Sequence, residues 1–144
     1  MKAFTDKKYQ IIYADPPWHY SGGIRSSKKD DYGNYLYYTP DTTVGASYRT
    51  QDDNWIKKLP VGQIAHSDAV LFLWTTDSHL PTALEVIKAW GFTYKTIGFI
   101  WNKKELSGTQ VCYYGKWTMK GSEICLLATK GAIHSRIQSH KVRQ

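Results

Sequence analysis

Residues 9–18 read YQIIYADPPW, an apolar run followed by an acidic residue, two prolines and a tryptophan. The apolar part, residues 9–14, is typical of a short buried strand. Proline has no N–H to donate to a ladder of hydrogen bonds, so the strand must end before Pro16. In open α/β sheets, ligands bind beyond the carboxyl ends of the strands. The stretch therefore predicts that Asp15 points into a ligand-binding crevice.

The remainder of the chain alternates between strand-like and helix-like patterns. Continuous apolar runs indicate buried strands, and apolar residues at helical spacing indicate helices. Pro81 suits a first helical turn and Gly91 suits the end of the same helix. The order predicts an α/β fold with a mainly parallel sheet and flanking helices. The expected strands are residues 9–14, 69–74, 93–101 and 123–129, and the expected helices are residues 51–59 and 80–90.

Two long segments, residues 19–47 and 102–119, show no clear period and are expected to be loops. Loops of this length within a compact domain are commonly functional or disordered. The first follows Trp18 directly, so both are expected to be active-site loops. The 144 residues together fit a single catalytic domain.

The composition is basic and aromatic. The formal net charge is +7 and aromatic residues make up 15% of the chain. A basic surface suits a polyanionic partner, of which nucleic acid is the commonest, and aromatic rings stack on bases. The charge alone is equally consistent with an ordinary soluble basic protein. DNA is the partner we expect.

Neither the cysteines nor the apolar segments suggest a metal, a secreted protein or a membrane span. The two cysteines, Cys112 and Cys125, lie outside any CxxC or His/Cys cluster, so no metal site is predicted. Cys125 stands in an apolar run and is expected to be a reduced core residue. No stretch approaches the roughly 18 apolar residues of a membrane span. A cytoplasmic location without membrane contact is the simplest inference.

The DPPW stretch suits methylation of an exocyclic amino group. The lone pair of such an amino group is delocalised into the base, which makes the nitrogen a poor nucleophile. A carboxylate and a rigid backbone carbonyl that accept its two hydrogens would stabilise the charge that develops as it attacks a methyl sulfonium. We expect the carbonyls of Pro16 and Pro17 to face outward without partners. Trp18 is expected to stack on the base, which must be flipped out of a duplex. The alternative is an ordinary Asp-Pro-Pro turn with Trp18 in the core.

Five blocks of the chain, taken in order, resemble the MT-A-seventy family of adenine methyltransferases, and the phage and bacterial branch is the more similar. The resemblance covers residues 9–144. It implies a Rossmann-like class I methyltransferase fold with a permuted order, in which the catalytic DPPW precedes the part that binds S-adenosylmethionine. It also implies methyl transfer to the amino group of adenine. The blocks are YADPPW, YRTQDDNWIKKLPV, AVLFLWTTDSHLPTALEVIKAWGF, FIWNK and YGKWTMKGSEICLLATKG.

The resemblance implies roles for individual positions. Asp15, Pro16, Pro17 and Trp18 match the catalytic motif. The matches to substrate-binding positions are Tyr48 in a first gate loop, Trp101 at the pocket rim with Lys103 beside it, and Trp117 in a second gate loop. The proposed cofactor contacts are Asp15, Ser122, which stands where eukaryotic relatives have a lysine, and Lys120 as a replacement for that lysine. For Tyr48, Trp101 and Trp117, a purely structural packing role remains open.

The sequence departs from the family pattern at its C-terminal side. Relatives continue after a segment resembling HKVRQ with the strands that hold most of the cofactor, and no glycine-rich turn here replaces them. We therefore expect an incomplete catalytic domain, completed by a second subunit or a complementing segment. Two alternatives stay open: a non-catalytic pseudo-methyltransferase that binds nucleic acid or a partner, and an enzyme that methylates the amino group of cytosine.

Overall fold

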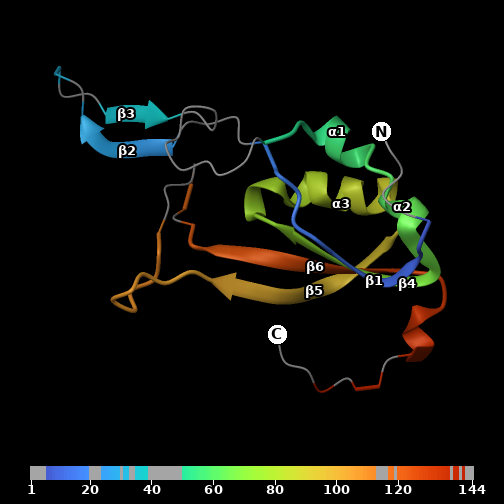
Figure 1. Cartoon of the computed structure of the whole chain (residues 1–144). Helices are drawn as coiled ribbons and strands as arrows, with labels where there is room; N and C mark the ends of the chain where they lie inside the picture. The colour runs from blue at the N-terminus through green and yellow to red at the C-terminus, as the bar shows by residue number, and fades with distance from the viewer. Residues whose placement is uncertain are drawn as a thin grey trace.

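The computed structural model describes residues 6–19, 24–29, 31–32, 35–38, 50–112, 117–118, 120–136, 138–139 and 141. Within them, a four-stranded sheet in the order β1-β4-β6-β5 forms the centre of the fold. Three α-helices precede or follow β4 in the chain (Figure 1). The strands of this sheet are β1 (Tyr9–Ala14), β4 (Ala65–Thr75), β5 (Thr93–Asn102) and β6 (Ser122–Lys130), and the helices are α1 (Asp53–Lys57), α2 (Val61–Ile64) and α3 (Leu80–Ala89).

The sheet is mixed, so the prediction of a mainly parallel sheet was wrong. β1 pairs with β4 in parallel, whereas β6 pairs with both β4 and β5 in the antiparallel sense. β1, β4 and β5 therefore run in one direction and β6 alone runs in the other. A central strand has the same apolar run whether it is parallel or antiparallel to its neighbours, so the sequence of β6 carries no sign of its direction.

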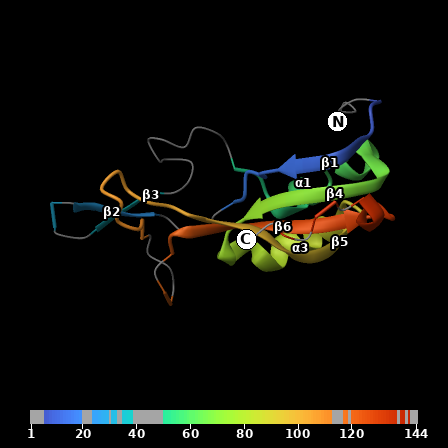
Figure 2. The ribbon, with the colours of Figure 1, turned by 90° about the horizontal axis from the view of Figure 1, so that it is seen from below.

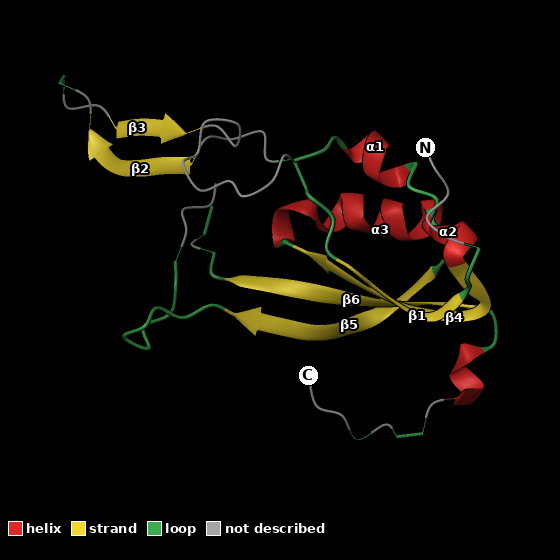
Figure 3. Ribbon diagram, in the orientation of Figure 1, coloured by secondary structure: helices red, strands yellow, loops and turns green. Residues whose placement is uncertain are grey.

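The α-helices cover one face of the sheet, as Figure 3 shows for α1 and α3 above the strands. The indole N–H of Trp90, which caps α3, donates to the carbonyl of Ile56 in α1 at 3.0 Å. α1 is itself capped by the Asp52 side chain, which accepts from the Trp55 N–H at 2.9 Å. These contacts hold α1 against α3, and α1 in turn fixes the residues that precede it.

The core lies between these helices and the sheet. Alternate residues of β4 face the helices, and Leu71 and Leu73 are fully buried there together with Val86 and Ile87 of α3. On the other face of β4, Phe72 and Trp74 are only half-buried. Seen from below, no described α-helix covers that second face (Figure 2). The expected flanking helices are therefore found on one side of the described sheet.

The expected strands and the longer helix agree closely with the structure. β1 has the predicted bounds, β4 extends beyond them, and α3 ends at Ala89 with Gly91 at a φ of 81°. The prediction of an unstructured loop at residues 19–47 was wrong in part. Within it, β2 (Ile24–Lys29) and β3 (Tyr35–Tyr38) form a two-stranded antiparallel sheet. The tyrosine-rich segment has high strand propensity, which outweighs the polar composition around it.

None of the helices formed by the described residues is long and apolar enough to cross a membrane.

Candidate active site

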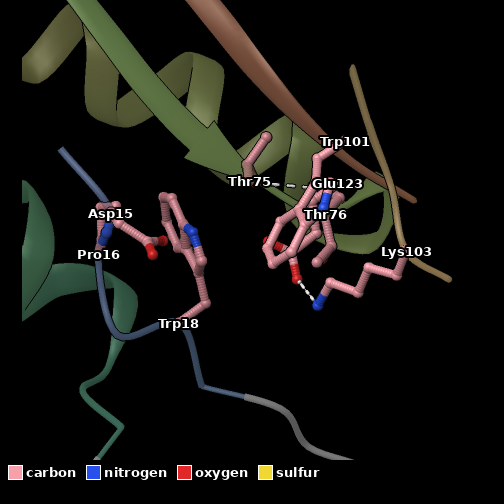
Figure 4. A pocket seen from close by; sticks show the side chains of 8 residues that line it. All are labelled: Asp15, Pro16, Trp18, Thr75, Thr76, Trp101, Lys103 and Glu123. Carbon is pink, nitrogen blue, oxygen red and sulfur yellow. Dashed lines mark hydrogen bonds and ion pairs between the residues drawn. The ribbon is translucent and has the colours of Figure 1, made fainter. Parts of the chain in front are cut away.

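A cavity of about 210 Å³ opens where the carboxyl ends of β1, β4 and β5 meet the amino end of β6. The sequence predicts a ligand-binding crevice at this edge of the sheet. The ribbon of β2 and β3 lies beyond the same edge in both views (Figures 1 and 2). The residues that line the cavity are Asp15, Pro16, Trp18, Thr75, Thr76, Trp101, Lys103 and Glu123 (Figure 4).

Asp15 follows β1 directly, and its side chain is exposed at this cavity. The pKa of its carboxyl group is raised above the usual value, chiefly because partial burial penalises the charged form. The neighbouring carboxylate of Glu123 raises the pKa further, and the ammonium group of Lys103 lowers it. Asp15 is therefore an acceptor with more affinity for a proton than an aspartate in water.

Trp18 is held in place by the end of β4. Its indole N–H donates to the carbonyl of Trp74 at 3.0 Å, and only 4% of the residue is exposed. One face of the ring stacks on His79, with ring centroids 5.6 Å apart. The ring therefore ties the segment after β1 to β4 and to His79, the residue before α3, and little of it is open to a stacking ligand.

The carbonyls of the two prolines are both engaged, so the prediction that they lack partners was wrong. The Pro16 carbonyl accepts from the N–H of Trp18 at 2.8 Å, and the Pro17 carbonyl accepts from the N–H of Gln51 at 2.8 Å. The missing N–H of proline removes a donor but leaves the carbonyl free to accept from any chain nearby, and the residues before α1 supply one. A carbonyl has two lone pairs, so Pro16 keeps one acceptor position.

His79 was not predicted as a site residue. It is buried and contacts the segment that follows β1. Its Nε2 donates to the carbonyl of His19 at 2.8 Å, because a carbonyl can only accept. In the neutral ring, Nδ1 then accepts from the hydroxyl group of Thr76 at 3.1 Å. Ring stacking, two hydrogen bonds and the Trp18 anchor together fix the backbone from Asp15 to His19.

The opposite wall of the cavity is formed where β5 and β6 pair. Trp101 and Glu123 are direct cross-strand partners, and Lys103 follows β5. The ammonium group of Lys103 forms an ion pair with the Glu123 carboxylate and lies 4.8 Å from the centroid of the Trp101 ring. Figure 4 shows this group facing Asp15 and Trp18 across the cavity.

The structure brings together some of the predicted site residues and separates others. Asp15, Pro16, Trp18, Trp101 and Lys103 line one cavity, whereas Ser122, Lys120 and Trp117 are absent from its described lining. Trp117 is 96% exposed. The ammonium group of Lys120 is paired with the Asp77 carboxylate and the Ser78 hydroxyl group. Tyr48 lies outside the described residues.

Thr75, Thr76 and Glu123 line the cavity without having been predicted as individual site residues. The two threonines end the apolar run of β4, so the rule that drew attention to Asp15 applies to them equally. Glu123 begins an antiparallel strand, and its place at this edge depends on the reversed direction of β6. No feature of the sequence indicates that direction.

The sequence profile of the MT-A70 family matches residues 9–144, the stretch that forms the whole of this sheet and cavity. The chain belongs to the MT-A70 family. This confirms the resemblance drawn from the five sequence blocks.

A curated methyltransferase is also similar to this chain. The chain is similar to the protein named Type II methyltransferase M.MunI from a Mycoplasma species, with 33% identity over 141 residues. The match covers 96% of this chain and 58% of the relative. The chain thus spans little more than half the length of that relative.

Proposed function

We propose that this chain carries the base-facing part of an S-adenosylmethionine-dependent methyltransferase that modifies the exocyclic amino group of adenine in DNA. The observation that carries the proposal is Asp15, which follows β1 and is exposed in a cavity lined by Trp101. Membership of the MT-A70 family and the similarity to a methyltransferase support methyl transfer. The net charge of +7 supports a nucleic-acid substrate.

The fold proposed for the complete enzyme is the Rossmann-like class I methyltransferase fold in permuted order. The central sheet of α/β character and the position of DPPW after its first strand support it. In that fold the part described here binds the base. A second subunit or a complementing segment would supply the remaining part.

The proposed chemistry assigns two acceptors to the amino group. The carboxylate of Asp15 accepts one hydrogen, and the second lone pair of the Pro16 carbonyl accepts the other. As the nitrogen gains a methyl group, it develops positive charge and must lose a proton. The raised pKa of Asp15 makes its carboxylate a suitable acceptor for that proton. The fixed backbone from Asp15 to His19 keeps both acceptors in place, so little reorganisation is needed during the reaction.

The described residues suit the cofactor mainly through charge. S-adenosylmethionine supplies an electrophilic methyl group on a cationic sulfur, and Asp15 and Glu123 place carboxylates on the walls of the cavity. Lys120 is already paired with Asp77, so a contact from Lys120 to the cofactor requires that pair to open. Ser122, at the start of β6, stays a proposed contact. Trp101 is proposed to face the base, with Lys103 beside it, and Tyr48 and Trp117 are proposed to approach the base from the gate loops.

The test is transfer of a labelled methyl group from S-adenosylmethionine to duplex DNA, with the modified base identified after hydrolysis. The chain is assayed alone and together with the part of the M.MunI relative that lies outside the match. We expect labelled N6-methyladenine, and a loss of at least about 100-fold in Asp15→Ala. Asp6→Asn is the matched control, because Asp6 is an exposed residue away from the cavity.

The same assay separates the alternatives. Label on the amino group of cytosine would replace the proposed substrate by the other amino base. DNA binding without methyl transfer, with the complementing segment present, would favour a pseudo-methyltransferase. Full activity in Asp15→Ala would contradict the proposed role of this carboxylate.

A further inference from the structure

The ion pair between Lys103 and Glu123 lies inside the wall of the cavity rather than on an open surface. The side chains of Lys103 and Glu123 are 27% and 25% exposed, respectively. Surface ion pairs of long flexible side chains contribute little, but a partly buried pair with a fixed backbone keeps a defined geometry. The cavity therefore has a fixed pair of opposite charges facing Asp15 (Figure 4).

The backbone of Lys103 is held on both sides. Its N–H donates to the carbonyl of Gly121 at 2.9 Å, and its carbonyl accepts from the N–H of Val111 at 3.0 Å. Gly121 has no space for a side chain, because a Cβ atom there would lie 2.0 Å from the Val111 carbonyl oxygen. Three chain segments thus converge at Lys103, and they direct its side chain back over Trp101 toward Glu123.

Trp101 is the exposed aromatic ring of the cavity, at 53% exposure compared with 4% for Trp18. It is held from two sides. The Lys103 ammonium lies 4.8 Å from its ring centroid, and the Trp74 ring meets it edge-on at 6.4 Å. A cation close to an indole ring is attracted by its π-electrons, which restrains the rotamer of an otherwise open side chain.

The same lysine balances the charges around Asp15. The charged and titratable groups that act on Asp15 or respond to it are Glu123 and Cys125 of β6 and Lys103 after β5. Glu123 raises the pKa of Asp15 and Lys103 lowers it. Without the lysine, two carboxylates would face one cavity from opposite walls, and one of them would tend to hold a proton.

We propose that Lys103 and Glu123 are positioning residues: their ion pair fixes the Trp101 ring for stacking on the base, the ammonium group of Lys103 offsets the Glu123 carboxylate that faces Asp15, and neither residue acts by contacting the substrate. This inference rests on the proposed function, and it replaces the direct substrate contact that the sequence implied for Lys103. One ion pair thereby prepares both the stacking surface and the acceptor of the site.

The test uses Lys103→Met, Glu123→Gln and Lys103→Arg, with Lys95→Met as the matched control. Lys95 is an exposed residue of β5 outside the cavity. Two readouts need no methyl transfer. The first is the titration of the Asp15 carboxyl carbon followed by NMR. The second is the fluorine NMR signal of Trp101 in fluorotryptophan-labelled protein, assigned with Trp101→Phe. The third readout is the pH profile of methylation.

In Lys103→Met we expect the pKa of Asp15 to rise, because the group that lowers it is lost. The acid limb of the methylation profile should then move to higher pH, and the Trp101 signal should shift. In Glu123→Gln the pKa of Asp15 and the acid limb should move in the opposite direction. Arginine can pair with Glu123 and stack on Trp101, so Lys103→Arg should keep the pKa of Asp15 and the Trp101 signal closer to wild type than Lys103→Met does. Lys95→Met should change nothing.

The outcomes separate this inference from the proposed function. If Asp15 and Trp101 respond as expected but the wild-type protein transfers no methyl group under any condition, the ion pair has its positioning role and the proposed function fails. If neither signal moves in Lys103→Met or Glu123→Gln, the positioning role is wrong, whatever the activity. A loss of methylation in Lys103→Met with an unchanged pH profile and an unchanged Trp101 signal would point instead to direct substrate contact.

Discussion

At the scale of single residues, the two cysteines have opposite surroundings. Cys112 is exposed, whereas Cys125 is fully buried in β6. Desolvation raises the pKa of the Cys125 thiol to about 11, and the negative charge of nearby Asp15 adds to the shift. The thiolate is the reactive form of cysteine, so this shift, like the burial, protects Cys125 from reagents.

We predict that the folded protein reacts rapidly with a disulfide reagent at one thiol only at pH 7–8. Unfolding in denaturant should release the second. Counting the coloured product before and after denaturation is the measurement. Cys112→Ser should abolish the rapid reaction of the folded protein and leave only the thiol that unfolding releases. Two thiols of equal reactivity in the folded wild-type protein would show that Cys125 is accessible.

Some residues of the site can be recognised from the local sequence, whereas the positions of others depend on residues far away in the chain. The place of Asp15 at the cavity could be predicted, because Asp15 directly follows a strand and ligands bind beyond the carboxyl ends of strands. The burial of Trp18 could not, because it depends on His79, which is 61 positions away in the sequence. The partners of the two proline carbonyls also come in part from elsewhere in the chain.

At the scale of elements, the turn after β6 is constrained by β4. Gly131 has a φ of 65°, in the left-handed region, and a Cβ atom there would lie 2.2 Å from the carbonyl oxygen of Ser67. The adjacent N–H of Ala132 donates to the Asp68 carboxylate at 2.7 Å. Glycine is thus required both for the backbone conformation and for the close approach of the two segments.

We predict that Gly131→Ala destabilises the protein by clearly more than Gly108→Ala. Gly108 also has a positive φ, 84°, but nothing lies within 4 Å of a Cβ atom there. The conformational cost common to both is about 1–2 kcal/mol, and only Gly131→Ala adds a steric clash with backbone. Denaturant unfolding of both variants gives the comparison. Equal losses of stability would contradict the close approach.

Elements were predicted more reliably than their arrangement. The bounds of β1 and α3 follow from local features: an apolar run ended by Pro16, and a helix between Pro81 and Gly91. The direction of β6 was missed because it depends on how the chain crosses from β5, through residues without a regular pattern. The pairing of β2 with β3 was missed for a related reason, since a short polar strand is recognisable mainly by its partner.

At the scale of the whole molecule, one layer of α-helices packs on one face of the sheet. The described core therefore lies on that side, and Leu73 is fully buried in it. Removing a buried leucine side chain loses its transfer free energy and leaves a cavity.

We predict that Leu73→Ala lowers the free energy of unfolding by about 2–5 kcal/mol. The matched control is Leu106→Ala, because Leu106 is fully exposed in the described structure and an exposed site should change by no more than about 0.5 kcal/mol. Thermal or denaturant unfolding of the two variants measures the difference. A small effect at Leu73 would mean that the core does not depend on the side chains that face α3.

The place of β6 between β4 and β5 also governs the order in which the sheet can be completed. Within the described sheet, β5 pairs with β6 alone, yet β6 is synthesised after every other strand. A ribosome adds about 5–20 residues per second, so β5 emerges seconds before its partner does. During that interval Phe99 and Trp101 have no strand beside them. Within the described sheet, β5 therefore depends on β6 for protection against aggregation, and a ribosome that stalls between β5 and β6 would expose an aromatic strand to chaperones.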